Sequence, residues 1–330
     1  MIKQKFPLGL HWPTIEPFLF CAHHRDHYPA GNAEFGVSPN LLAGRDLGQD
    51  FELKDGFRMY HGESVPGFPV HPHRGFETIT VVRQGFADHA DSMGAAGRYG
   101  QGDVQWMTAG RGVQHSEMFP LINKNGKNTL ELFQIWLNLP KADKMSAPDF
   151  KMFWHEKIPV YQSGGAQVTV IAGQLFDAIA MQPPKASWAA KPESDVAVWL
   201  IKLAPNAQLA LPPAKNGTIR NLYFYEGSDL VIDQTSVKSG FGYYVDAETE
   251  LQLRTNETAA EILLLQGRPI GEPILQHGPF VMTSKEEIIQ TFRDYERTQF
   301  GGWPWPRLDM IHGEKAERFA KYPDGRVERP

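Results

Sequence analysis

The chain has 330 residues, with 33 lysine and arginine residues against 38 aspartate and glutamate residues and a formal net charge of −5. This balance argues against a protein whose main task is to neutralise nucleic-acid phosphates. The single cysteine, Cys21, excludes an internal disulfide framework and cysteine-based zinc fingers. No apolar run approaches the ~20 residues of a membrane span. We therefore expect a cytoplasmic protein of about two domains, with no membrane association and no direct nucleic-acid binding.

Short apolar stretches separated by glycines indicate a β structure in the first half of the chain. From about residue 51 to residue 140 they recur every ~8–12 residues, which is typical of an antiparallel sandwich or barrel. A polar connector at residues 141–148 and an irregular stretch of about twenty residues follow, and a second β-rich series begins near Val168. We expect two β domains joined near residues 140–165. The clearest strand candidates are Glu77–Val82, Gly102–Met107, Leu130–Leu139, Val196–Leu203, Leu222–Gly227 and Ala260–Gly267.

The C-terminal part has a different character. The segment 284–297 opens with Ser284, places acidic residues in its first turn and spaces its apolar residues at helical intervals, which predicts a helix. The residues from 301 onward are too few for a domain. We expect an extended tail that lays Trp303 and Trp305 on the body of the protein or on a neighbouring subunit.

Two pairs of residues are candidates for a metal site. His71 and His73 are two positions apart, so on a strand both imidazoles point to the same face and can converge on one ion. A second strand that presents His115 and Glu117 in the same way completes a set of three nitrogens and one oxygen.

Each pair taken alone also has a structural interpretation. The 12 histidines give about 0.4 His-x-His pairs by chance, so this motif needs support from its context. That support comes from a second predicted strand ahead of His115. This strand ends in a tight turn at residues 109–112, which returns the chain toward the first pair. The histidines at positions 23, 24 and 27 are expected in a polar surface loop, and His89 is expected to order the structure near the site.

Two segments carry a resemblance to a known family. The sequence HPHRGFET at residues 71–78, followed by GDVQWMTAGRGVQHSE at residues 102–117, resembles the signature segments of the pirin family within the cupin superfamily. The resemblance extends to Asn138–Pro140 and Gln266–Met282, and the tail after about Gly302 has no counterpart in it. It implies two antiparallel cupin barrels, or double-stranded β-helices. We expect an N-terminal cupin domain with the metal site at 1–145, a C-terminal cupin domain at 146–300 that ends in the helix, and a tail at 301–330.

The resemblance also implies the ligands of one metal ion, His71, His73, His115 and Glu117. Glu77, which occupies the carboxylate position of a general cupin motif, is then a structural or supporting carboxylate. Fe(II) suits such a donor set best, with Mn, Co, Ni, Cu and Zn as competitors. Partners for the second ring nitrogens are expected among Gln105, Gln114 and Ser116. No histidine lies between residues 168 and 271, so the second barrel is expected to have lost its metal site.

Several pirins resemble quercetinases, and this implies a metal-dependent dioxygenase that opens a flavonol-type ring with dioxygen and releases carbon monoxide. Glu117 would then be the catalytic base for the substrate's 3-hydroxyl group. Four apolar residues would shape a pocket unless they are ordinary core: Phe76, Trp106, Met107 and Phe133. The alternative implied by eukaryotic pirins is a redox-responsive, metal-binding regulator that acts through protein partners. A third interpretation is a metal store or a site without metal.

Overall fold

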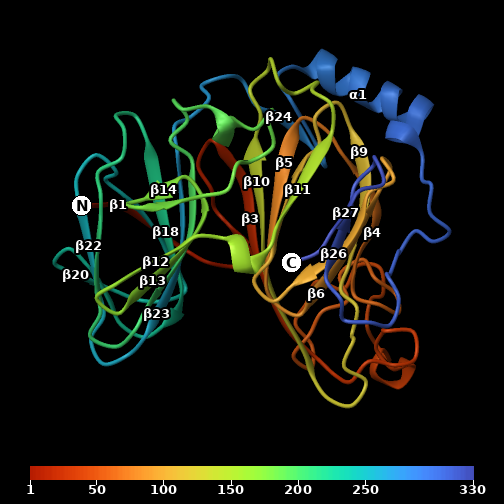
Figure 1. Cartoon of the computed structure of the whole chain (residues 1–330), viewed down its shortest axis with the longest axis horizontal. Coiled ribbons are helices and arrows are strands. Elements are labelled where there is room, and N and C mark those ends of the chain that lie inside the picture. Colours follow the sequence, from red (N-terminus) through yellow and green to blue (C-terminus); the bar gives the residue numbers. More distant parts are fainter. The chain divides into compact units, whose positions relative to one another are not determined.

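The short apolar stretches of the sequence form β-strands in the computed structural model of the chain, which describes residues 1–330 (Figure 1). The prediction of a mainly β fold with a helix near the C-terminus is therefore confirmed. The strands belong to two units, each of which collects separate parts of the chain. Unit 1 consists of Met1–Ala22, Ile135–Pro140 and Lys157–Glu272, and unit 2 consists of His23–Gln134, Lys141–Glu156 and Pro273–Pro330.

These units are not the contiguous ranges that the sequence suggested. The C-terminal residues, including the helix, lie in unit 2 with the candidate metal-site residues, and the first residues of the chain lie in unit 1. Strand pairing accounts for the places of the first residues and of the tail. β26 (Phe319–Lys321) pairs with β7 (Ala96–Gly100), and β1 (Ile2–Pro7) pairs with β21 (Phe241–Val245). Local sequence patterns carry no information on pairings between such distant segments.

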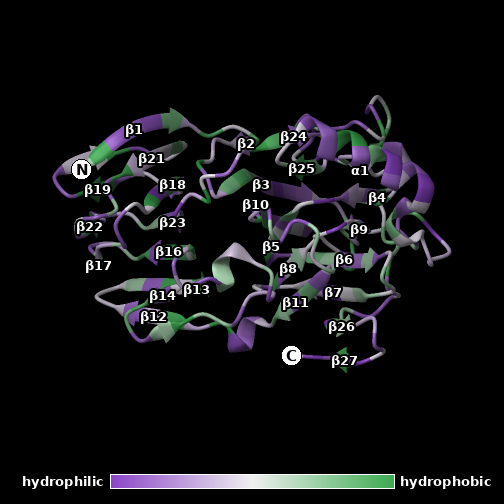
Figure 2. Ribbon diagram, turned by 90° about the horizontal axis from the view of Figure 1, so that it is seen from above, coloured by the Kyte–Doolittle hydropathy of each residue, from purple (hydrophilic) through white to green (hydrophobic).

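Unit 1 is built on a seven-stranded sheet, whose strands form a row in Figure 2. Its order is β1, β21, β18 (Ile219–Gly227), β23 (Ala260–Gly267), β16 (Ala197–Leu203), β13 (Ala166–Ala172) and β12 (Val160–Ser163). A four-stranded sheet has the order β17 (Gln208–Leu211), β22 (Leu251–Arg254), β19 (Leu230–Ile232) and β20 (Thr235–Val237). A small hairpin consists of β14 (Gln174–Leu175) and β15 (Ala178–Ile179).

Apolar side chains from both sheets of unit 1 form one core. Trp199, Leu222 and Leu264 come from the seven-stranded sheet, and Leu211 and Leu251 come from the four-stranded one. All five are almost completely buried. Burial of these side chains holds the two sheets face to face.

Unit 2 is built on two six-stranded sheets. The first has the order β11 (Asp149–Phe153), β8 (Val104–Thr108), β5 (Phe76–Gln84), β10 (Asn128–Asn138), β3 (Phe18–Tyr28) and β2 (His11–Trp12), and its β2, the start of β3 and the end of β10 are counted with unit 1. The second has the order β27 (Val327–Glu328), β26, β7, β6 (Phe86–Asp91), β9 (Val113–Met118) and β4 (Gly67–His73), which Figure 2 shows in succession. Val82, Met107 and Leu132 from the first sheet meet Tyr99 and Val113 from the second in a shared core.

The only α-helix, α1 (Lys285–Thr298), confirms the helix predicted at residues 284–297. Ser284 is its N-cap and accepts a hydrogen bond from the backbone N–H of Glu287. The hairpin of β24 (Leu275–His277) and β25 (Phe280–Met282) precedes it, and Ile288 packs against Phe280. Short 3-10 turns occur at Pro39–Leu41, His155–Lys157, Trp188–Ala190 and Gln299–Gly301. None of the helices has the length and apolar character needed to cross a membrane.

Three expectations about local structure are wrong. The stretch after residue 148 contains the strands β11 and β12 and is not irregular. The histidines at 23, 24 and 27 lie on strand β3 instead of a loop, and His24 is buried. The tail is more than an extended arm, because β26 and β27 add two strands to a sheet of unit 2.

Candidate metal centre

Two neighbouring strands present the candidate histidines. β4 ends at His73, and β9 lies beside it in antiparallel pairing, with His71 directly opposite His115. The register shifts between Phe68 and His71, so a β-bulge sets which residues of β4 face β9. The turn between β8 and β9 is closed by a hydrogen bond from the Gly112 backbone N–H to the Ala109 carbonyl, as the sequence predicted. Gly112 has φ +128° and no room for a Cβ atom against the Phe300 ring, which explains the glycine.

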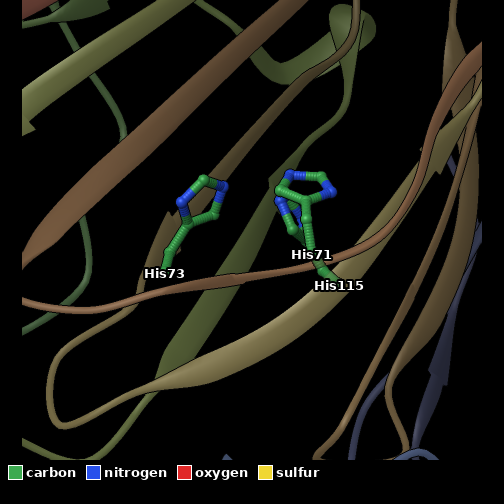
Figure 3. A group of neighbouring side chains, drawn as sticks. All are labelled: His71, His73 and His115. Carbon is green, nitrogen blue, oxygen red and sulfur yellow. The ribbon is translucent and has the colours of Figure 1, made fainter. Parts of the chain in front are cut away.

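The three histidines form one group. One ring nitrogen from each of His71, His73 and His115 lies within 4.8 Å of the others, and Figure 3 shows the rings gathered in one place. The ring centroids of His71 and His115 are 4.4 Å apart, and those of His73 and His115 are 4.9 Å apart. His73 and His115 are buried, whereas His71 retains partial exposure.

Burial keeps the three imidazoles neutral. It lowers the pKa of His71 from 6.5 to about 4, and it lowers the pKa of His73 and of His115 well below the ordinary value. The mutual repulsion of the imidazolium forms adds to this effect on His73 and His115. Neutral imidazole is the form that ligates a metal.

Hydrogen bonding at the ring nitrogens also suits metal binding. The Nδ1 atom of His71 lies 2.8 Å from the Pro69 carbonyl, which makes Nδ1 the protonated nitrogen and leaves the Nε2 lone pair free to ligate. Both ring nitrogens of His115 are buried and make no hydrogen bond. An unsatisfied buried imidazole is costly in a protein without a ligand, so the residues present fit a metal ion.

Glu117 lies against this group. Its Oε2 atom is 3.8 Å from Nε2 of His115. Three side chains hold the carboxylate. Gln134 Nε2 donates to Oε2 at 3.0 Å, and Thr80 Oγ1 (3.0 Å) and Tyr99 Oη (3.3 Å) lie within hydrogen-bond distance of Oε1. The single Thr80 hydroxyl proton is shared between Glu117 Oε1 and the side-chain oxygen of Gln134, which lies 2.6 Å away. Burial raises the pKa of Glu117, and the nearby His89 and these hydrogen bonds act in the opposite direction.

Sequence reasoning missed the three residues that hold Glu117. They come from β5, β7 and β10, which are distant from Glu117 along the chain. A signal was present in two of them, because Thr80 and Gln134 are polar residues within strands whose neighbouring positions are apolar. A buried polar residue in such a strand needs a hydrogen-bond partner inside the protein.

His89 lies next to the group, on the strand β6 that pairs with the other edge of β9. It is paired with Glu117 in the register, and its ring centroid is 5.5 Å from that of His115. Its Nε2 atom lies 3.0 Å from a carboxylate oxygen of Asp91, and both residues are fully buried. The expectation that His89 orders the structure near the site agrees with these contacts.

The partners proposed for the second ring nitrogens are wrong. Gln114 donates to the carbonyls of Gln299 and Gly302, and the Gln105 side-chain oxygen lies 3.4 Å from the Tyr99 hydroxyl, whose proton it shares with Glu117. The hydroxyl of Ser116 makes no hydrogen bond. Gln114 and Ser116 alternate with His115 along β9, so their side chains point to the opposite face of the sheet.

The remaining candidate site residues are buried among core residues of the protein. Glu77 is buried on β5 and accepts a 2.6 Å hydrogen bond from Thr108. Phe76, Trp106, Met107 and Phe133 are fully buried. Of these four, Phe76 makes a ring contact with the group, at 5.1 Å from His73. In this structure they are therefore core residues.

Comparison with protein families gives two matches. Residues 9–137 match the family described as Pirin, and residues 198–301 match the Pirin C-terminal cupin domain. The first range contains all four candidate ligands. The residues after 301, which include β26 and β27, lie outside both matches.

Similar proteins point in the same direction. A Pseudomonas aeruginosa protein whose name provisionally assigns it as a quercetin 2,3-dioxygenase is 39% identical over 234 residues, which cover 70% of this chain and 79% of that protein. A pirin-like protein of Caulobacter vibrioides is 37% identical over 235 residues, covering 71% and 80% of the two chains. The crystal structure of quercetin 2,3-dioxygenase from Acinetobacter baumannii superposes with a TM-score of 0.72 at 26% identity, covering 91% of this chain and 98% of that one.

Proposed function

Because the chain belongs to the pirin family, we propose that it binds one divalent metal ion through His71, His73, His115 and Glu117 and acts as a metal-dependent dioxygenase on flavonol-type substrates. The observation that carries this proposal is the group of three neutral, mutually close imidazoles with a buried carboxylate beside it. Three imidazole nitrogens and one carboxylate oxygen favour Fe(II), with Mn, Co, Ni, Cu and Zn as the competing ions.

The bound metal ion would supply a Lewis acid for the substrate oxygen and a redox centre for the reaction with dioxygen. The protein's own contribution centres on Glu117. Its raised pKa makes it a stronger base than an exposed glutamate, suited to accept the proton of the 3-hydroxyl group on a carboxylate oxygen. The hydrogen bonds from Thr80 and Gln134 fix the direction in which that carboxylate points. We infer that a small aromatic substrate approaches from the side of His71, which is the least buried of the three histidines.

We place this activity in the cytoplasm, since a chain with one buried cysteine needs no oxidising compartment for its fold. Such a reducing environment also keeps iron in the Fe(II) state.

Quercetin turnover tests the proposal directly. Iron-loaded protein is incubated with quercetin in air, and the loss of visible absorbance is followed together with oxygen uptake and carbon monoxide release. We expect oxygen uptake and carbon monoxide release in equal amounts, and neither in protein treated with a chelator. Metal binding without any metal-dependent turnover of flavonols contradicts the dioxygenase and favours the redox-responsive regulator.

The ligand set is tested separately by elemental analysis. His71→Ala is expected to lower the bound metal strongly. Glu117→Gln is expected to lower both metal content and turnover, because the amide is a weaker ligand and no base. Glu77→Gln is the matched control, a buried carboxylate of the same unit that bonds to Thr108, and it should retain its metal. Retention of metal in His71→Ala contradicts the assignment of that histidine.

A further inference from the structure

The two segments that carry the histidines also carry two arginines that the metal centre does not use. Arg74 follows His73, and Arg111 lies in the turn before β9. Both line a cavity of about 590 Å³ in unit 2, together with Asp294 and Arg297 of α1. None of the three histidines lines this cavity. It is therefore a separate site formed where α1 meets the turns next to β4 and β9.

Arg74 is part of the framework of the cavity. It is 5% exposed, its Nε donates to the Arg111 carbonyl at 2.7 Å, and its Nη1 donates to Asp294 at 2.9 Å. Its guanidinium lies over the Phe300 ring, 4.5 Å from the centroid. The Nη2 group donates to no protein atom. A buried arginine at the wall of a cavity thus keeps donor capacity that the protein itself does not satisfy.

The other two arginines bring the lining to three positive charges. The Arg111 side chain is exposed and makes neither a hydrogen bond nor an ion pair. Arg297 is 75% exposed and shares Asp294 with Arg74, at 3.3 Å. Asp294 is the one acidic residue of the lining, so three guanidinium groups face a single carboxylate. This local excess of positive charge stands in a chain whose net charge is −5.

The remaining walls are largely apolar, with Met93, Met145, Pro148 and Phe300 among the lining residues. We propose that this cavity binds a small organic carboxylate, with its carboxylate between Arg111 and Arg297 and its apolar body against Met93 and Met145. The planar guanidinium matches a carboxylate with two parallel hydrogen bonds. The volume is in the range of small-molecule sites, roughly 300–1,000 Å³. Inorganic phosphate fits less well, because its second charge meets Asp294 and it leaves the apolar walls uncovered.

Calorimetric titration with benzoate tests this proposal. The full-length protein is treated with a chelator, so that benzoate has no metal to bind, and the titration is repeated on metal-loaded protein. We expect saturable binding of equal affinity in both forms, and none of the uncharged isostere benzamide. Arg111→Gln and Arg297→Gln should each weaken benzoate binding by about tenfold, the effect of one charge-assisted hydrogen bond. Neither substitution should change the metal content.

Arg293→Gln is the matched control, since Arg293 is an exposed arginine of α1 that does not line the cavity. It should bind benzoate like the parent protein, and Arg111→Lys should retain part of the affinity. Equal weakening by Arg293→Gln, benzoate binding that requires metal, or phosphate binding without benzoate binding each overturns the proposal. Because the titration uses metal-free protein, its outcome does not depend on whether the protein is a dioxygenase.

Discussion

Burial and hydrogen bonding act on the Glu117 carboxyl group in opposite directions. Burial alone raises its pKa, whereas the donors Thr80, Tyr99 and Gln134 stabilise the charged form. The carboxylate is thereby held in one orientation and remains more basic than a surface glutamate. A residue that serves as both a ligand and a base benefits from this combination, because its orientation does not depend on the metal alone.

Removal of one of these donors should weaken metal binding. We expect Thr80→Val to lower the metal affinity by about tenfold, the lower end of the usual cost of losing a partner of a ligand. Competition with a chromophoric chelator measures this affinity. Thr78→Val is the matched control, because Thr78 lies two residues earlier on the same face of β5 and its buried hydroxyl makes no hydrogen bond. An equal loss in both variants would assign the effect to packing.

The depressed pKa of His71 predicts a pH dependence of stability. Between the unfolded value of 6.5 and the folded value of about 4, the unfolded chain binds a proton that the folded chain does not bind. Acid therefore favours unfolding in this window, and the contribution of His71 to stability is complete above it. The thermal midpoint of metal-free protein should fall from pH 6.5 to pH 4, with a shallower fall in His71→Asn. Parallel curves for the two proteins would show that His71 is not the group responsible.

At the level of residues, the sequence predicts which side chains of one strand share a face. The same-face spacing of His71 and His73 is correct, because side chains on a strand alternate. The cross-strand pairing of His71 with His115 depends on a β-bulge in β4, which no local sequence pattern shows. His23 illustrates the converse error. It stacks on Phe133 and bonds to Glu131, so its run of polar neighbours did not mark a surface loop.

Among the elements, α1 has residues that mark both its start and its end. Ser284 accepts from the backbone N–H of Glu287, and the Glu287 carboxylate accepts from the backbone N–H of Thr283 at 2.9 Å and from its hydroxyl at 2.6 Å. This reciprocal arrangement resembles a capping box and fixes the start of the helix. The end is marked by Gln299 with φ +49°.

Loss of the N-cap should destabilise the helix measurably. Ser284→Ala removes an acceptor worth about 1 kcal/mol, which corresponds to a fall of about 2–4 °C in the thermal midpoint of a unit of this size. Ser284→Asp keeps an acceptor at the same position and should stay close to the parent protein. Differential scanning calorimetry measures both. A midpoint unchanged in Ser284→Ala would show that packing of Ile288 alone holds the helix start.

Elements with strong local signals were predicted well, and those that depend on distant partners were not. The stretch Ala260–Gly267 coincides with β23 because a run of buried apolar residues between polar ends indicates a central strand. β11 and β12 were not predicted, since each is a short strand that is stabilised by pairing with a partner strand, β8 and β13 respectively. The pairing of β26 with β7 joins segments more than 200 residues apart and lies beyond any local pattern.

At the scale of the whole molecule, the residues after 301 are tied to unit 2 by specific contacts. Trp305 donates to the Asp91 carbonyl at 2.8 Å, while Trp303 donates to the Arg307 carbonyl within the tail itself. Arg318 donates to the buried carboxylate of Asp103 at 2.8 Å. These contacts identify the tail as part of the unit and not as an appendage.

The pair of Arg318 and Asp103 allows a test of this view. Arg318→Leu leaves the buried carboxylate without its charged partner, so we expect a loss of about 1–3 kcal/mol in unfolding free energy. Burial raises the pKa of Asp103, and the guanidinium of Arg318 opposes that rise. Arg326 is an exposed residue of the same tail that pairs with the half-buried Glu328, so Arg326→Leu should cost less than about 1 kcal/mol. Urea denaturation compares the two, and equal losses would contradict the structural role of Arg318.

The pairing of β1 with β21 has a consequence for the newly made chain. Ile2 is opposite Val245, so during synthesis β1 is not fully paired until 243 residues beyond Ile2 have been added. At about 5–20 residues per second, this strand waits roughly 12–50 s with its hydrogen-bonding groups unpaired. Its sequence IKQKFP carries two lysines and a proline, residues that discourage an exposed strand from pairing with a neighbouring chain. The composition of β1 is thus suited to the interval before its partner exists.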